Sequence, residues 1–124
     1  MSAPFTIAIV DDDPDVRGSL DSLMRSAGFM ARCFASAEAL LCDAAYDALG
    51  CIVTDVHMPG MDGLDLQAEI ARRGWTKPMI VMTAYPTETA RERAMAAGAL
   101  AFLTKPVDPD MLLEAIEKVV LQDR

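Results

Sequence analysis

Basic residues are scarce in this chain, with 11 Lys and Arg against 19 Asp and Glu, a net charge of -8 and a pI of about 4.4. This deficit opposes binding to nucleic acid, which needs cations to displace phosphate counterions, and to anionic membrane surfaces. Apolar runs of the roughly 20 residues that span a bilayer are also missing. The N-terminus, Met-Ser-Ala-Pro-Phe, lacks the charged and apolar segments of a signal peptide. We therefore expect a cytoplasmic protein that binds neither nucleic acid nor a membrane.

Cysteine and histidine are also few. Cys33, Cys42 and Cys51 form no Cys-x-x-Cys pair, and His57 is the only histidine, so a disulfide framework or a zinc site is disfavoured. We expect small buried thiols instead. No linker, repeat or low-complexity run interrupts the 124 residues, which predicts one domain over residues 1–124 with no output domain within it.

Five short apolar runs rich in β-branched residues predict strands at 5–10, 29–34, 50–54, 79–82 and 100–103. Each is followed by a helix-capping residue and by apolar residues at helical spacing. The caps are Asp13, Ser36, Asp62, Thr87 and Asp108, and glycines 28, 74 and 98 end three of the helices. The expected inner faces are Val16, Leu20, Leu23 and Ala27 in the first helix and Leu112, Ile116 and Val119 in the last. This alternation predicts an α/β fold with a parallel sheet.

Polar residues follow the ends of the predicted strands. Asp11 and Asp12 follow the first strand, Asp55 the third, Thr83 the fourth, and Lys105 comes shortly after the fifth. Because the carboxyl ends of parallel strands share one edge, where α/β proteins bind ligands, we expect three carboxylates, a hydroxyl and an ammonium to converge. Asp55 alone could equally cap the turn that follows it, but this convergence favours a functional site.

The chemistry of the expected cluster points to phosphoryl transfer. Clustered carboxylates repel, so at neutral pH they need a cation or raised pKa values, and oxygen ligands favour a hard ion such as Mg²⁺. Such an ion would neutralise charge on an incoming phosphoryl group, and a carboxylate such as Asp55 can accept that group as an acyl phosphate. Lys105 and Thr83 supply an ammonium and a hydroxyl for the phosphate oxygens.

The motifs of this chain resemble those of the receiver domains of two-component response regulators along nearly its whole length. They are Ile9-Val-Asp-Asp12, Thr54-Asp-Val-His-Met-Pro-Gly-Met-Asp-Gly63, Met82-Thr-Ala84, Gly98-Ala99 and Leu103-Thr-Lys-Pro106. The resemblance implies a doubly wound, flavodoxin-like fold, in which five parallel strands in the order 2-1-3-4-5 are flanked by five helices.

The resemblance also implies roles for the acidic residues. Asp55 would be the phosphoacceptor, taking the phosphoryl group from the phosphohistidine of a sensor histidine kinase. Asp12, Asp55 and the backbone carbonyl of His57 would bind Mg²⁺, for which Mn²⁺ can substitute. Asp11 would act through a metal-bound water.

Further roles follow for the other strand ends. Thr83 would move to contact the phosphoryl group and Lys105 would pair with it. Phe102 matches an aromatic position whose rotamer reports the switch, although an apolar strand residue is also a common core residue. The peptide bond between Lys105 and Pro106 would be cis.

The loop after Asp55 contains structural and modulating positions. Pro59 and Gly63 shape this loop. The side chain of His57 is expected to be solvated rather than to bind metal, and in the family the positions of His57 and Tyr85 modulate dephosphorylation. In the first acidic segment, Asp13 is expected to cap a helix rather than join the acidic pocket.

Together these features imply a phosphorylation-controlled signalling switch and not a classical enzyme. Its reactions would be Mg²⁺-dependent phosphoryl acceptance and autodephosphorylation at Asp55. Phosphorylation would alter the face formed by the fourth helix, the fifth strand and the fifth helix. The expected partners are a sensor histidine kinase or phosphotransfer protein of a phosphorelay, an output domain or downstream protein, and a second copy in a phosphorylation-dependent homodimer.

Two alternatives stay open from the sequence. A metal-dependent phosphatase would use Asp11 or Asp13 as nucleophile in an Asp-x-Asp arrangement, but it needs a cap or further motifs that 124 residues scarcely accommodate. A degenerate receiver would act purely as a binding module, and the presence of all five key residues argues against it.

Overall fold

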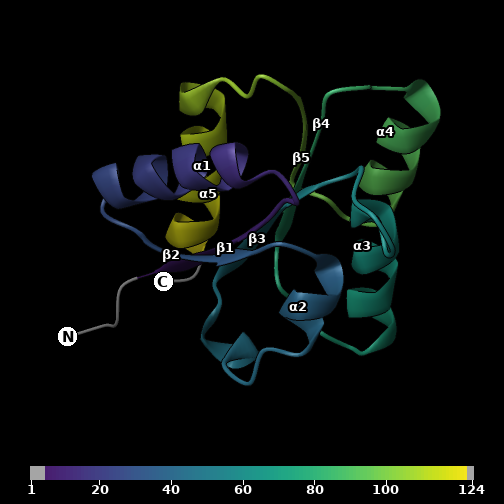
Figure 1. Ribbon diagram of the computed structural model, residues 1–124, viewed down its shortest axis with the longest axis horizontal. Helices are drawn as coiled ribbons and strands as arrows, with labels where there is room; N and C mark the ends of the chain where they lie inside the picture. Colours follow the sequence, from purple (N-terminus) through teal and green to yellow (C-terminus); the bar gives the residue numbers. More distant parts are fainter. Residues whose placement is uncertain (1–4, 123–124) are drawn as a thin grey trace.

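The five predicted strands form one parallel sheet. The computed structural model describes residues 5–122, in which the strand order is β2-β1-β3-β4-β5, as predicted (Figure 1). The strands are β1 (Thr6–Val10), β2 (Met30–Phe34), β3 (Cys51–Asp55), β4 (Met79–Thr83) and β5 (Ala101–Thr104). Every residue of β3 and β4 is buried, because helices cover both faces of a parallel sheet and its inner strands are apolar throughout.

Five α-helices alternate with the strands, and most begin at the predicted caps. They are α1 (Pro14–Ser26), α2 (Ala37–Leu41), α3 (Gly63–Arg72), α4 (Glu88–Ala96) and α5 (Pro109–Gln122). The side chains of Asp13, Ser36, Asp62 and Thr87 each accept a backbone N–H of the first turn that follows, which satisfies donors that have no partner inside the helix. A short 3₁₀ helix, η1 (Tyr46–Ala48), was not predicted.

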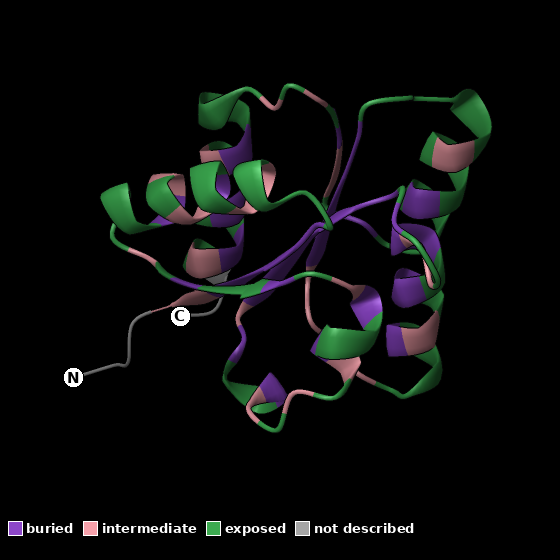
Figure 2. Ribbon diagram, in the orientation of Figure 1, coloured by how far each residue is buried: buried purple, intermediate pink, exposed green. Residues whose placement is uncertain are grey.

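The helices divide between the two faces of the sheet (Figure 1). Helices α1 and α5 pack on one face through Leu20, Met24, Leu112 and Ile116, together with Ile7 and Ile9 of β1. On the other face, α2, η1 and α3 pack against Ala8 and Val10 of the same strand. Figure 2 shows the buried sheet between helices whose outer surfaces are exposed. Neighbouring residues of β1 therefore serve opposite cores, as strand geometry requires.

Helix α4 is held less firmly than the others. Ala94 is its only buried residue. The small cluster in which Ala94 packs includes Val81 of β4, Ala99 just before β5 and half-buried Phe102 of β5. The side-chain amide of Gln67 in α3 donates a buried hydrogen bond of 3.0 Å to the carbonyl of Ala94. This helix therefore depends on a small apolar contact and one buried polar contact.

Three expectations about burial need correction. Cys51 is buried, but Cys33 and Cys42 are exposed. Cys33 lies on β2, which is an edge strand with a neighbouring strand on one side only, and Cys42 is the C-cap residue of α2. In α1, Ala27 is exposed and Met24 takes its expected place in the core, because the helix ends at Ser26 before its last predicted turn is complete. The predicted inner face of α5, Leu112, Ile116 and Val119, is buried as expected.

Across residues 5–122, none of the helices has both the length and the apolar character that a bilayer crossing requires.

Candidate functional site

The strand register brings the predicted site residues to one edge of the sheet. The paired residues nearest that edge are Val10 with Thr54, Asp55 with Met82, and Thr83 with Thr104. Asp11 follows β1 directly, Asp55 and Thr83 are the last residues of their strands, and Lys105 follows β5. Strand β3 runs one residue further than predicted and includes Asp55, because the N–H of Val56 continues the ladder to the carbonyl of Met82 at 2.9 Å.

Asp11 is fixed through every polar group it has. Its N–H donates to the carbonyl of Phe34 at 3.1 Å. Its Oδ1 accepts the N–H of Asp13 at 2.9 Å, and its backbone carbonyl accepts Nη1 of Arg17 at 2.7 Å. Its Oδ2 accepts Nζ of Lys105 at 2.7 Å. Asp11 is fully buried, so these bonds replace the water that a carboxylate would otherwise require.

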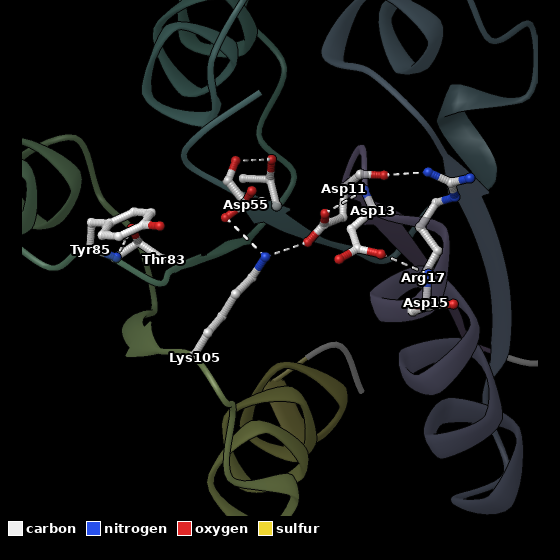
Figure 3. A network of polar contacts seen from close by, with 9 residues as sticks. Asp11, Asp13, Asp15, Arg17, Asp55, Thr83, Tyr85 and Lys105 are labelled. Carbon is white, nitrogen blue, oxygen red and sulfur yellow. Dashed lines mark hydrogen bonds and ion pairs between the residues drawn. The ribbon is translucent and has the colours of Figure 1, made fainter. Parts of the chain in front are cut away.

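Lys105 joins the two buried carboxylates (Figure 3). Its Nζ lies 2.7 Å from Oδ2 of Asp11 and 3.2 Å from Oδ1 of Asp55, and its side chain is 18% exposed. The peptide bond that follows, Lys105–Pro106, is cis, the isomer that the resemblance implied. One ammonium therefore serves carboxylates that come from two different strands.

Asp12 completes an acidic cluster. One carboxylate oxygen from each of Asp11, Asp12 and Asp55 lies within 4.8 Å of the others, and Asp12 is the exposed member. Three carboxylates and the ammonium of Lys105 leave two negative charges, which a divalent cation would balance. The donors are all hard oxygens, as Mg²⁺ prefers, and the exposed side leaves room for its waters. The residues present therefore fit a magnesium ion.

The pKa values in the cluster reflect the same crowding. Burial first, and the neighbouring charge of Asp11 second, raise the pKa of Asp55 above its usual value, although Lys105 opposes this shift. Burial by itself would lower the pKa of Lys105, but the hydrogen bonds and charges of Asp11 and Asp55 outweigh it and raise that pKa. Lys105 therefore stays charged at neutral pH, while part of the charge of Asp55 is left without compensation.

Thr83 and its neighbours form the other side of the site. Thr83 is fully buried, and its Oγ1 accepts the backbone N–H of Tyr85 at 3.0 Å. Because the hydroxyl is the acceptor in this bond, its proton remains available to another acceptor. The rings of His57 and Tyr85 meet edge to face at 5.6 Å, and both residues are exposed. The side chain of His57 therefore lies on the surface, whereas Asp13 is occupied as the cap of α1.

The loop after Asp55 is held close to the end of β3. The N–H of Gly63 donates to the carbonyl of Val56 at 2.8 Å. A Cβ on Gly63 would overlap the carbonyl oxygen of Asp55, so the backbones approach more closely than any other residue allows. On its outer side, the loop is fixed by Glu38 of α2, whose Oε2 accepts the N–H of Met61 at 3.1 Å.

We expect Gly63→Ala to lower the free energy of unfolding by about 1–3 kcal/mol, the range for overpacking a tight contact. The added methyl group would push the start of α3 away from the carbonyl of Asp55. Chemical denaturation measures the loss. Gly18→Ala is the matched control, because a Cβ at Gly18 in α1 meets no atom within 4 Å and alanine favours a helix. Equal stability of the Gly63 variant and the parent would contradict the close approach.

Two residues near the site were missed by the sequence analysis, Arg17 and Glu38. The position of Arg17 could have drawn attention to it. The first turns of a helix favour acidic residues over basic ones, so an arginine four residues after the cap Asp13 is unusual. Glu38 had no signal in the sequence, since its contact with Met61 joins residues 23 positions apart.

A doubly wound sheet that carries an acidic cluster, a bridging lysine and a buried threonine at its carboxyl edge defines the class of CheY-like α/β domains. The chain belongs to the response regulator receiver domain family, whose model matches residues 7–117. It is therefore a signal-transduction module of a two-component system.

Curated relatives and solved structures agree with this assignment. The chain is 44% identical over 110 residues to the response regulator protein TmoT of Ectopseudomonas mendocina, a match that covers 89% of this chain and 50% of TmoT. It is 37% identical to the transcriptional regulatory protein FixJ of Bradyrhizobium diazoefficiens, over 98% of this chain and 60% of FixJ. The chain thus spans about half the length of the curated relatives it matches.

Solved structures give the same result. The structure of response regulator StyR superposes with a TM-score of 0.89 at 39% identity, and the match covers 97% of this chain and 61% of that one. The structure of FixJ-N superposes with a TM-score of 0.83 at 36% identity, covering 96% of this chain and 94% of that one.

Proposed function

We propose that this receiver domain is a phosphorylation-controlled switch in which Asp55 accepts a phosphoryl group from a sensor histidine kinase or phosphotransfer protein. The proposal is supported by a difference among the three carboxylates, namely which of their oxygens already accept hydrogen bonds. Both oxygens of Asp11 are engaged, by Asp13 and Lys105, and Asp12 lies exposed at the rim. Among residues 5–122, no hydrogen bond engages Oδ2 of Asp55, which leaves that oxygen free to act as nucleophile.

The transfer uses groups that are already in place. An oxygen of Asp55 forms a bond to phosphorus while the bond from phosphorus to the donor imidazole nitrogen breaks, so the phosphoryl group changes partner and no oxidant or reductant is needed. Lys105 and the hydroxyl of Thr83 would hold the phosphoryl oxygens. In autodephosphorylation, water would attack the acyl phosphate and release inorganic phosphate.

A magnesium ion at the acidic cluster would neutralise charge on the phosphoryl oxygens. Asp12, Asp55 and the carbonyl of His57 would bind it directly, Asp11 would act through a water, and Mn²⁺ would substitute. Among the described residues, no donor engages the His57 carbonyl, which supports its role as a ligand.

The switch would begin at Thr83. If its hydroxyl turns toward a phosphoryl oxygen, the bond from the N–H of Tyr85 to Oγ1 is lost. The segment that leads into α4 is then released, and α4 has only one buried residue, fewer than any other α-helix of the described chain. The face of α4, β5 and α5, where Met95, Leu100 and Met111 are exposed, would change with it, and half-buried Phe102 would change its rotamer.

This changed face would bind an output domain, a downstream protein or a second copy of the chain. Residues 1–124 would act as one receiver domain, and the reaction would take place in the cytoplasm. The alternative of a phosphatase finds no support in the geometry, because Asp11 is engaged at both oxygens and Asp13 caps α1.

The test is phosphorylation with a small acyl phosphate and Mg²⁺, read by intact mass. We expect the protein to gain one phosphoryl group, and the gain to be lost in Asp55→Asn and when Mg²⁺ is removed. Asp47→Asn is the matched control, since Asp47 is an exposed residue of η1. Equal phosphorylation of the Asp55→Asn variant and the parent would place the acceptor elsewhere. Turnover of free phosphate esters, lost in Asp11→Asn, would favour a phosphatase.

A further inference from the structure

We propose that Arg17 is a positioning residue for the metal site. Its guanidinium fixes the peptide unit between Asp11 and Asp12 and thereby holds the Asp12 carboxylate beside Asp55. The inference rests on the proposed function, because it gives Asp12 the role of a metal ligand.

The backbone at this point has left the sheet. The N–H of Asp11 still bonds to the carbonyl of Phe34, the last residue of β2, at 3.1 Å. Within residues 5–122, no backbone N–H donates to the carbonyl of Asp11, and Nη1 of Arg17 donates to it at 2.7 Å (Figure 3). This distance is at the short end of the range for a hydrogen bond from a charged donor. Arg17 therefore replaces the ladder where β1 opens into the acidic segment.

Fixing the Asp11 carbonyl also fixes Asp12. The peptide unit is planar, so the direction of the carbonyl of Asp11 sets that of the N–H of Asp12. On the other side, the N–H of Asp13 is anchored on Oδ1 of Asp11 at 2.9 Å. Asp12 thus stands between two anchored peptide units. Its own side chain is exposed and, within residues 5–122, accepts no hydrogen bond, so its aim depends on its backbone.

Arg17 bonds a backbone carbonyl and not a carboxylate. Arg17 contacts the backbone of the acidic segment at Asp11, yet among the described residues it forms no ion pair with any of the three clustered carboxylates. A guanidinium that bonds a carbonyl leaves the carboxylates free for a cation, whereas one that paired with them would compete with it. The local helix does not explain this arginine, because the N-terminal turns of a helix favour acidic residues.

The test distinguishes the positioning of Asp12 by Arg17 from the electrostatic effect of the Arg17 charge. Removing a positive charge beside an acidic site should by electrostatics alone tighten Mg²⁺ binding. We expect the opposite for Arg17→Met, an apparent Kd for Mg²⁺ raised about tenfold, the lower end of the effect of outer-shell partners. Arg17→Lys, which keeps a donor, should recover part of the loss. Arg25→Met is the matched control, since Arg25 lies on the same helix and, in the described part of the chain, forms an ion pair only with Asp21, at 3.0 Å.

Backbone amide chemical shifts during a Mg²⁺ titration give these affinities, and the same spectra show whether each variant is folded. Unchanged or tighter binding in Arg17→Met would overturn the inference, as would equal weakening in Arg25→Met. If Arg17→Met does not fold, Arg17→Gln replaces it, with weaker binding expected and parental binding overturning the inference. A parent protein that binds no Mg²⁺ would instead refute the proposed metal site.

Discussion

Lys105→Ala is expected to lower the free energy of unfolding of the metal-free protein by about 3 kcal/mol, the lower end of the cost of breaking a buried ion pair. The Lys105 ammonium lies 2.7 Å from Asp11 and 3.2 Å from Asp55, whose side chains are 1% and 7% exposed. Without it, two neighbouring carboxylates remain buried with no cation between them. Chemical denaturation with a chelator present measures the effect.

Lys118→Ala is the matched control for this variant. Lys118 lies 3.9 Å from Glu114 in a pair whose side chains are both more than two-thirds exposed, and such surface pairs contribute little. A Lys105 variant as stable as the Lys118 variant would contradict the buried bridge. Saturating Mg²⁺ should reduce the deficit, because the ion supplies part of the lost positive charge.

The same variant should separate phosphorylation from switching. Mg²⁺ binding is expected to be kept or tightened, since Lys105 is not a ligand and its positive charge opposes a cation at the cluster, and acyl phosphate should still modify Asp55. The rearrangement of residues 83–104 should be lost, because no ammonium draws the phosphoryl group toward β5. Amide chemical shifts before and after phosphorylation measure this response. Equal shift changes in the variant and the parent would refute the role of Lys105.

Asp55→Asn is expected to stabilise the metal-free protein at neutral pH. Burial and Asp11 raise the pKa of Asp55 above its usual value of 3.8, so the folded protein holds this proton more tightly than the unfolded chain. Stability linked to Asp55 is therefore fully present below that usual value and is lost as the pH rises through the raised pKa of the folded state. The amide in the Asp55→Asn variant does not ionise, so the variant does not lose this stability as the pH rises. Lys105 keeps Asp11 as its partner.

With Mg²⁺ present, we expect the parent to become more stable than the Asp55→Asn variant. A ligand present at 100 times its Kd stabilises the folded state by about 2.7 kcal/mol, and Asp55→Asn would lose most of this gain with the carboxylate that we propose as a metal ligand. Thermal unfolding of both proteins, with chelator and with Mg²⁺, from acidic to neutral pH measures the difference. A stability difference that does not depend on pH in the metal-free proteins would contradict the raised pKa of Asp55.

The fold was almost fully predictable from local patterns. Buried runs, capping residues and terminal glycines are short-range signals, and together they gave the parallel α/β class, while the family resemblance gave the strand order. What they missed was local detail, such as η1, the exposure of Cys33, and Met24 in the core. These depend on which helix covers which part of the sheet, and residue spacing alone does not contain that information.

The composition of the site was also largely predicted. Asp11, Asp12, Asp55, Thr83 and Lys105 each stand where a strand ends, and all parallel strands end at one edge. The sequence did not show that one ammonium joins the carboxylates of Asp11 and Asp55. It also did not show that the Thr83 hydroxyl accepts from Tyr85.

The set of chemical groups that gather at the site follows from the sequence alone, because residue types and strand ends are local properties of the chain. How these charges are paired and held depends on contacts between distant parts of the chain. The contact between Lys105 and Asp11 joins residues 94 positions apart. The carbonyl that Arg17 holds is free only because β1 ends there. Such contacts depend on distances across the sheet, which the packing of β1, β3 and β5 fixes once the whole domain has folded.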